Sequence, residues 1–142
     1  MAKLHLQIIT PEQVKLDEDA DMVIMRCTTG DMGILPGHQA CSAILDYGVM
    51  RILDGDAERR IAVFGGIAQV RNDEVFILAN DAQWPEDIDQ VRAQRERELA
   101  ELQMRDSEDD LEIRRNQVLM RRTLVQIEVS SYPLVGKAKK DG

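Results

Sequence analysis

Hydrophobic and polar positions alternate along much of the first 84 residues of this chain of 142. The alternation is clearest in LHLQII at residues 4–9 and in DMVIMRC at residues 21–27. Turn-forming residues separate such stretches, and Asp54-Gly55 and Asn72-Asp73 suit two-residue hairpin turns. Short strands divided by Gly, Asp and Pro predict an all-β sandwich or barrel. The remaining β-rich stretches are VMRIL, RIAVFGG, IAQVR and EVFILA.

The hydrophobic pattern changes at Trp84-Pro85, from the alternation typical of strands to a spacing typical of helices. Pro85 suits the first position of a helix, where its missing N–H would have no partner, and acids at positions 86, 87 and 89 complement the helix dipole. Good helix formers then continue, so we predict a helix from residue 85 to about residue 105. Its narrow apolar stripe consists of Ile88, Val91, Leu99 and Leu102.

Ser107 is the expected N-cap of a second helix, because three acids follow it in the first turn. This helix runs to about residue 129, and Leu111, Val118 and Val125 recur on it every seven residues. A short loop between the two helices predicts an antiparallel hairpin. Its apolar seam is narrow, and helices of roughly 20 residues are marginal alone, so we expect the hairpin to pack against another part of the protein.

These patterns predict an α+β protein in three parts. Residues 1–84 form a β-sandwich, residues 85–130 form the helical hairpin, and residues 131–142 form a polar, flexible tail. No apolar run approaches the roughly 20 residues that span a bilayer, and the N-terminus lacks the apolar core of a signal peptide. We therefore expect a cytoplasmic protein.

The charge is acidic but unevenly distributed. A net charge of −8 argues against nucleic acid as a partner, because phosphate binding needs a basic surface. Residues 1–84 hold 7 Lys and Arg against 13 Asp and Glu, whereas residues 85–142 hold 11 against 13, including eight of the 13 arginines. The arginine content of the helical part therefore needs an explanation.

Signs of catalysis are lacking in the sequence. His38 and Cys41 form HQAC, but further ligands at metal spacing do not follow. Neither a Ser/Cys–His–acid pattern nor a phosphate loop stands out, so an enzyme that uses His5 or His38 is unsupported. We predict no catalytic residue and no metal, and we expect Cys27 and Cys41 to be buried or half-buried without a disulfide.

Several stretches share their order with one known family. GDMGILPGH at residues 30–38 is similar to the signature G-E-x-G-[IV]-L-P-G-H, and ITPEQVKL, AVFGGIAQVRNDEVFILAN and EDIDQVRA occur where that family has its first hairpin, its later strands and its domain junction. Together they resemble the epsilon subunit of the F-type ATP synthase (delta in mitochondria). The resemblance covers roughly residues 3–130.

This resemblance implies a β-sandwich of about ten strands at the foot of the central stalk, against the gamma subunit and the c-ring. Such a subunit turns with the rotor, couples ion translocation to ATP synthesis, and requires no cofactor. Its hairpin packs beside the sandwich when folded; when extended, it reaches along gamma into the alpha and beta subunits and blocks ATP hydrolysis. The implied location is peripheral, at the cytoplasmic face of the bacterial plasma membrane, with membrane contact only through the c-ring.

The resemblance also implies contacts for Asp31 and His38, which lie in the glycine-rich stretch 30–38. A loop that sits on the c-ring or gamma needs a fixed shape, and glycine and proline provide its tight turns. Asp31 and His38 then offer polar contacts. The alternative is that the glycines only turn the chain and that His38 only makes a local hydrogen bond.

Two arginine pairs lie on the second predicted helix. Arg114 and Arg115 recur as Arg121 and Arg122 one heptad later, which gives a basic face. The resemblance implies that this face meets an acidic motif of the beta subunit during inhibition. The alternative is a solvated face whose arginines pair with acids one turn away, such as Glu112.

EDIDQVRA is similar to the motif by which some bacterial epsilon subunits bind ATP as a regulatory ligand. In that interpretation Ile88 covers the adenine, Asp89 accepts a hydrogen bond from its amine, and Ala93 leaves room for the ring. Arg92 and, from the second helix, Arg122 meet the phosphates. The alternative is that the motif only begins the helix and packs Ile88 on the sandwich.

Three positions depart from the nucleotide-binding members of the family. Those members carry an acid where this chain has Gln83, and arginines where it has Leu99 and Gln126. Each lost charge-assisted contact costs about 1.5–3 kcal/mol, so any ATP binding should be weak. A second functional class, a free-standing nucleotide-sensing protein that uses the same hairpin without a rotor, also stays open.

Overall fold

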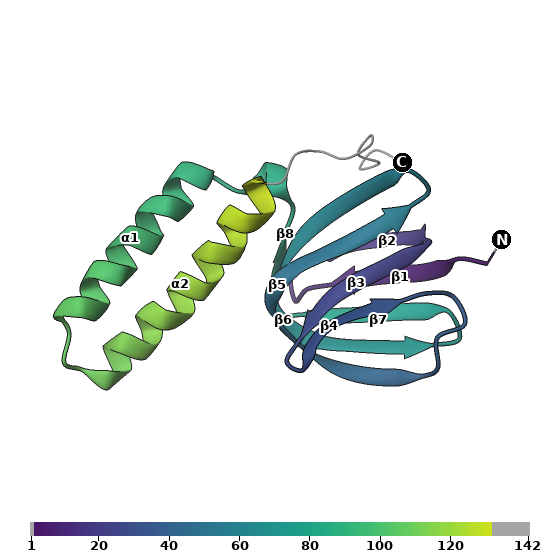
Figure 1. Ribbon diagram of the computed structural model, residues 1–142, viewed down its shortest axis with the longest axis horizontal. Helices are drawn as coiled ribbons and strands as arrows, with labels where there is room; N and C mark the ends of the chain where they lie inside the picture. The colour runs from purple at the N-terminus through teal and green to yellow at the C-terminus, as the bar shows by residue number, and fades with distance from the viewer. Residues whose placement is uncertain (1, 132–142) are drawn as a thin grey trace.

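The computed structural model describes residues 2–131, and Figure 1 shows a β-sandwich with a helical hairpin at its side. The predicted α+β architecture is confirmed. The predicted tail, apart from Ser131, lies outside the described residues. The strands are β1 (Leu4–Ile9), β2 (Val14–Ala20), β3 (Met22–Cys27), β4 (Gly30–Ile34), β5 (Cys41–Asp54), β6 (Ala57–Arg71), β7 (Glu74–Ala79) and β8 (Ala82–Gln83). A 3-10 helix η1 (Pro85–Asp87) and the helices α1 (Gln90–Asp106) and α2 (Asp110–Ser131) follow.

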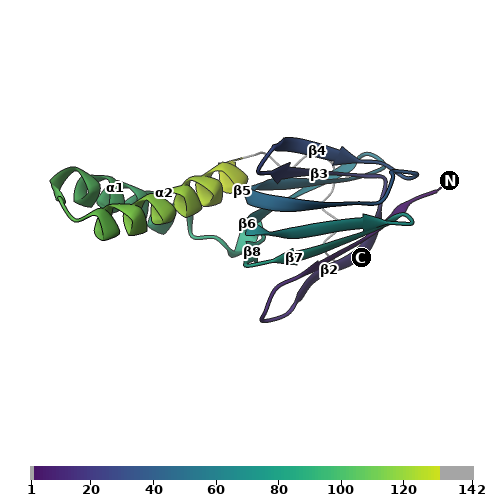
Figure 2. The ribbon, with the colours of Figure 1, turned by 90° about the horizontal axis from the view of Figure 1, so that it is seen from below.

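One hydrogen-bonded network joins all eight strands of the described chain. Its order is β2-β1-β7-β6-β5-β3-β4, with β8 added beside β6, and only β1 and β7 pair in parallel. Figure 2 shows β3 and β4 in one layer and β7 and β2 in the other. The long strands β5 and β6 are the only path between the two layers in this network, so their shape determines how the sandwich closes.

Strand β6 bends at Gly65-Gly66, whose φ angles are +79° and +139°. Before the bend Ile61 and Val63 point into the core, and after it Ala68 and Val70 do so, so the inward face changes from odd to even positions. RIAVFGG and IAQVR were predicted as two strands, because the two glycines between them are typical of a turn. Pairing with β5 nevertheless continues through the bend. Because β5 and β6 are each continuous through the bend, the described chain has eight strands where about ten were expected.

The core confirms the alternation predicted for LHLQII. Leu4, Leu6 and Ile8 are fully buried, while the residues between them are partly exposed. Strand β2 was indicated only by the resemblance of ITPEQVKL to the family's first hairpin, because its VKLDEDA sequence buries only Leu16 and Ala20. Strand β4 lies in the glycine-rich stretch 30–38, which was expected to be a loop, because the strand is short and rich in glycine. Cys27 is buried and Cys41 is partly buried, and both are free thiols.

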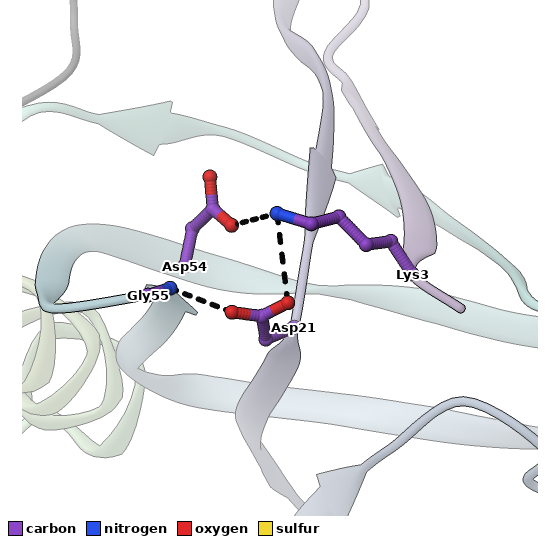
Figure 3. A network of polar contacts seen from close by, with 4 residues as sticks. All are labelled: Lys3, Asp21, Asp54 and Gly55. Atoms are coloured by element: carbon purple, nitrogen blue, oxygen red, sulfur yellow. Dashed lines mark hydrogen bonds and ion pairs between the residues drawn. The ribbon is translucent and has the colours of Figure 1, made fainter. Parts of the chain in front are cut away.

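Charged groups fasten the N-terminus to the β5–β6 turn (Figure 3). Lys3 pairs with Asp54, and its Nζ atom also lies 3.5 Å from Asp21. Asp21 in turn accepts a hydrogen bond of 2.6 Å from the backbone N–H of Gly55. The Asp54 carboxylate raises the pKa of the Lys3 amine. The predicted turn at Asn72-Asp73 is present, and both residues have positive φ angles. The other turn was predicted one residue too early: Asp54 is the last residue of β5, and the turn is formed by residues 55 and 56, with a positive φ at Gly55.

The first helix begins later than predicted. Pro85 opens the 3-10 helix η1, the chain is extended at Ile88, and α1 starts only at Gln90. The predicted cap of the second helix is also wrong. Asp109, not Ser107, caps α2, because its carboxylate accepts the Leu111 N–H at 3.0 Å. Ser107 instead binds the Asp109 N–H and the Glu112 carboxylate, within the loop between the helices.

The apolar stripe predicted for the first helix does not form its buried face. Val91, Leu99 and Leu102 are 60%, 57% and 55% exposed. The buried residues are instead Ala93 and Ala100 of α1 and Asn116, Thr123, Val125 and Val129 of α2. Small residues allow two helix backbones to approach closely, which leaves the larger side chains outside. No helix among residues 2–131 is long and apolar enough to cross a membrane.

Replacing Gly66 by Ala should destabilise the sandwich strongly. A Cβ there would lie 2.1 Å from the Leu78 carbonyl oxygen, at a φ angle that other residues rarely adopt. We expect a loss of more than about 3 kcal/mol, measured by urea unfolding and circular dichroism. Gly55→Ala is the control, because that position has positive φ but open space, and it should cost only about 1 kcal/mol. Equal losses in both variants would contradict this account.

Candidate functional site

A pocket lies where the hairpin joins the sandwich. Its volume is about 320 Å³, near the lower limit of roughly 300–1,000 Å³ for small-ligand sites. Its walls come from β8, η1 and the start of α1, together with the second half of α2. The lining residues are Gln83, Asp87, Ile88, Asp89, Arg92, Ala93, Glu96, Arg122 and Gln126. The structure therefore brings together all five residues predicted for nucleotide contact.

Ile88 and Asp89 have clear structural roles at this pocket. Ile88 packs against an apolar cluster that includes Phe64 of the sandwich and Val125 of α2. Asp89 is the N-cap of α1, because its carboxylate accepts the Arg92 N–H at 3.1 Å. The motif therefore begins a helix and packs Ile88 on the sandwich, as the alternative interpretation proposed. Contact with a nucleotide stays a prediction.

Both pocket arginines already contact carboxylates. Arg92 Nε lies 2.9 Å from Glu96 on the next turn of α1. Arg122 lies 2.6 Å from Asp81, and its guanidinium stacks 4.2 Å from the centre of the Phe64 ring. A phosphate would compete with these carboxylates for the guanidinium groups, and exposed pairs of this kind are worth at most about 1 kcal/mol each. The sequence did not indicate Asp81 or Glu96 as neighbours of the pocket arginines.

The residues that depart from the nucleotide-binding pattern are explained in part. The Gln126 side-chain amide donates a hydrogen bond of 2.7 Å to the side chain of Gln83, so this bond joins α2 of the hairpin to β8 of the sandwich. This neutral hydrogen bond stands where the nucleotide-binding pattern has an acid and an arginine. Leu99 does not line this pocket and is exposed nearer to the α1–α2 loop.

The four arginines of α2 divide into two pairs. Arg121 pairs with Asp46 and lies 4.9 Å from the centre of the Tyr47 ring, while Arg122 contacts Asp81. Arg114 and Arg115 are exposed and take part in no ion pair within residues 2–131. The pairing with Glu112, offered as an alternative, is not formed, since Glu112 accepts the Ser107 hydroxyl.

Asp31 and His38 lie at opposite ends of the β4 segment. Asp31 accepts a long hydrogen bond of 3.5 Å from Arg26, and otherwise faces solvent. His38 follows the strand, and its Nδ1 atom lies 2.7 Å from the Gln39 carbonyl oxygen. The neighbouring Gly37 N–H binds Asp73 at 2.6 Å, which holds the loop. The structure does not bring Asp31 and His38 together, and a partner contact for either stays a prediction.

His5 sits between two carboxylates on the exposed face of β1 and β2. Its ring nitrogens lie 2.8 Å from Asp19 and 2.6 Å from Asp17. The hydrogen bond to Asp19, helped by Asp17, raises the pKa of His5 above its ordinary value of 6.5. The pairing therefore stabilises the fold fully below pH 6.5, and this contribution is lost as the pH rises through the higher folded pKa. Groups of three or more metal ligands do not occur in the described part of the chain.

An apolar row crosses the outer face of the sandwich, and the sequence analysis missed it. In the strand registers Ile44 pairs with Ile67, Ile67 with Leu78, and Leu78 with Ile9. Ile44, Ile67 and Leu78 are 63%, 47% and 44% exposed. The signal was present as isoleucine at outward positions of β5 and β6, but the register was needed to align them. We call Ile9, Ile44, Ile67 and Leu78 the apolar row.

Comparison with known proteins decides the family. The family model described as "ATP synthase, Delta/Epsilon chain, beta-sandwich domain" matches residues 3–85. The ATP synthase epsilon chain of Alkalihalophilus pseudofirmus is 38% identical, over 78% of this chain and 83% of that one. The protein belongs to the ATP synthase epsilon chain family. The epsilon chain of Halalkalibacterium halodurans is 34% identical, over 92% and 98% of the two chains. The chloroplastic one of Citrus sinensis is 32% identical, over 89% and 95%.

Solved structures of ATP synthases contain the same fold as this epsilon-family chain. A chain of the Euglena gracilis mitochondrial ATP synthase aligns with a TM-score of 0.83 and 21% identity, over 93% of this chain and 83% of that one. A chain of the Tetrahymena thermophila central stalk and c-ring aligns with a TM-score of 0.59 and 12% identity, over 92% and 98%. At such identities the comparison shows the shared fold.

Asp89→Ala should destabilise the protein by about 1 kcal/mol through loss of the α1 cap. Asp89→Ser should retain most of that stability, because a hydroxyl also accepts the Arg92 N–H. Thermal unfolding of the two variants without nucleotide measures the difference. Equal unfolding temperatures for the Ala and Ser variants would show that the cap is unimportant.

Proposed function

We propose that this epsilon-family chain is a central-stalk subunit of an ATP synthase that couples ion translocation to ATP synthesis. An epsilon chain is a component of the ATP synthase rather than its catalytic subunit. The sandwich docks on the gamma subunit and the c-ring, and the hairpin regulates ATP hydrolysis. The subunit then lies at the cytoplasmic face of the bacterial plasma membrane, and the c-ring provides its only membrane contact.

The apolar row is the observation that carries this proposal. Single exposed apolar residues are ordinary, but a continuous row across β5, β6, β7 and β1 is typical of a protein interface. All four residues lie within the segment that the family model matches. We assign this row to gamma, and we assign the loop around Asp31 and His38 to the c-ring. The other proposed partners, the alpha and beta subunits, meet the hairpin.

Docking on gamma should depend on the apolar row. Ile67→Asp places a charge in its centre and should weaken co-purification with gamma at least about ten-fold. Leu124→Asp is the matched control, because Leu124 is 46% exposed and Ile67 47%, but Leu124 lies on the hairpin. Circular dichroism checks that both variants fold. Full gamma binding by folded Ile67→Asp would overturn the assignment of this face.

The hairpin is proposed to inhibit ATP hydrolysis through its basic residues. Arg114 and Arg115 remain exposed in the packed hairpin, so an acidic segment of the beta subunit can approach them. Replacing both by Gln should raise ATP hydrolysis by the assembled enzyme several-fold. Glu101→Gln and Arg105→Gln, which remove an ion pair on α1, form the control. Hydrolysis that stays unchanged would show that Arg114 and Arg115 are only a solvated surface.

A second proposal is that the pocket binds ATP as a regulatory ligand. It is supported by the convergence of Arg92 from α1 and Arg122 from α2 on one cavity, which exists only while the hairpin is packed. ATP would therefore stabilise the packed state by its higher affinity for that state. Acids near both arginines and the neutral Gln83–Gln126 pair make the site weak. The same binding without a rotor would describe the free-standing nucleotide sensor.

Calorimetric titration of ATP into the isolated protein tests this second proposal. We expect a dissociation constant of about 1 mM, equivalent to about −4 kcal/mol, with weaker binding of GTP. Arg92→Ala should remove the binding, whereas Arg95→Ala, one turn away and outside the pocket lining, should not. An absence of binding up to millimolar ATP would leave EDIDQVRA as a helix start alone.

A further inference from the structure

The hairpin contacts the sandwich through a repeated arrangement of arginine, aromatic ring and carboxylate. Arg121 lies over Tyr47 and pairs with Asp46, while Arg122 lies over Phe64 and pairs with Asp81. Tyr47 and Phe64 are themselves register partners in β5 and β6, with ring centres 5.7 Å apart. Two consecutive arginines of α2 thus occupy two adjacent sites of the same chemical kind.

These charged contacts form a large share of the attachment. The buried apolar part of the interface is small: from α2 it includes Val125 and Val129, with Ile88 packed beside them. The exposed face of α1 does not supply more, because Val91 and Leu99 point to solvent. Each of the ion-paired side chains is also about one-third exposed or more. Contacts of this type form and break readily, and salt weakens them.

We propose that Asp46 and Asp81 are internal competitors for an acidic partner of Arg121 and Arg122. In the packed state the sandwich occupies the two guanidinium groups with its own carboxylates. An acidic peptide segment of a partner can bind these arginines only after Asp46 and Asp81 release them. That the partner belongs to the ATP synthase rests on the proposed function; the competition itself rests on the contacts in this chain.

The first arginine pair shows why the competition matters. Arg114 and Arg115 precede Arg121 and Arg122 by one heptad, but lack a carboxylate partner within the described residues. A partner can therefore reach Arg114 and Arg115 while the hairpin is packed. It gains Arg121 and Arg122 only when α2 separates from the sandwich. The two pairs then act in sequence, with Asp46 and Asp81 setting the threshold for the second step.

The first experiment measures packing in the isolated full-length protein. Hydrogen–deuterium exchange of the α2 amides should become faster in Asp46→Asn/Asp81→Asn, by about five-fold for each lost contact. Glu101→Gln is the charge-matched control, because it breaks an exposed ion pair with Arg105 on α1. High salt should accelerate exchange more in the wild type than in the double variant, in which the Arg26–Glu128 pair between β3 and α2 remains. Exchange like that of the control would overturn the proposal.

The second experiment measures competition with a short oligo-glutamate peptide. Fluorescence anisotropy of the labelled peptide should show about ten-fold tighter binding to Asp46→Asn/Asp81→Asn than to the wild type. Adding Arg121→Gln and Arg122→Gln to that variant should abolish the gain. An oligo-lysine peptide controls for the altered net charge.

The outcomes separate this inference from the proposed function. Equal peptide affinity in the wild type and in Asp46→Asn/Asp81→Asn would overturn the competition, even if the sandwich binds gamma. A gain that survives the loss of Arg121 and Arg122 would overturn it as well. A gain that depends on the arginines supports the competition, even if Ile67→Asp leaves gamma binding intact and the rotor assignment fails.

Discussion

The close approach of the Gly66 backbone to Leu78 is the constraint on which the other features depend. The room for it exists only because position 66 has no side chain, and its φ of +139° lets β6 turn without leaving the sheet. Before the bend, Phe64 faces the helices and its N–H binds the Asp81 carbonyl oxygen at 3.0 Å. After the bend, Ile67 faces outward in the apolar row. One backbone feature thus orients both the surface that receives the hairpin and the surface proposed for gamma.

The hairpin attachment and the pocket share their key residues. Arg122 lines the pocket, stacks on Phe64 and pairs with Asp81, while the Gln83–Gln126 hydrogen bond closes the same junction. Any ligand that engages Arg122 therefore also acts on the packing of α2. Binding and packing cannot be varied independently at this site, which is the condition for a ligand to shift the population of the packed state.

The sequence predicted those features that one segment determines alone. The alternation of β1 identified its buried face, and Asn72-Asp73 identified a hairpin turn, because each depends on neighbours in the chain. The single strand β6 was missed because its two glycines are typical of a turn, whereas here they bend a continuous strand and change the parity of its inward positions. The buried face of α1 was wrong because the hairpin seam selects Ala93 and Ala100 for their small size, whereas hydrophobicity alone favours leucine.

At the candidate site, too, the features set by one segment could be predicted, whereas contacts between distant segments could not. The resemblance of EDIDQVRA to a known motif pointed to four residues of this stretch and to Arg122 of α2, and all five line one pocket. The carboxylate that occupies Arg122, and the hydrogen bond between Gln83 and Gln126, join segments 41 and 43 residues apart. Hydrophobic period and local spacing contain no information about such pairs. Only the folded chain shows that Glu96 and Asp81 already contact the two arginines that were expected to meet phosphate.

The one-sided attachment of the hairpin also has a mechanical consequence. Contacts with the sandwich are concentrated near Arg121 to Val129, so the opposite end of α2, near Leu111, is an unsupported arm (Figure 1). At 1.5 Å per residue, the arm from Leu111 to Val125 is about 21 Å long. A pivot of about 10° at its base therefore moves the tip by about 4 Å, close to the rise of three residues of helix. Small rearrangements among Tyr47, Phe64 and the two arginines would therefore be amplified several-fold at the far end of the hairpin.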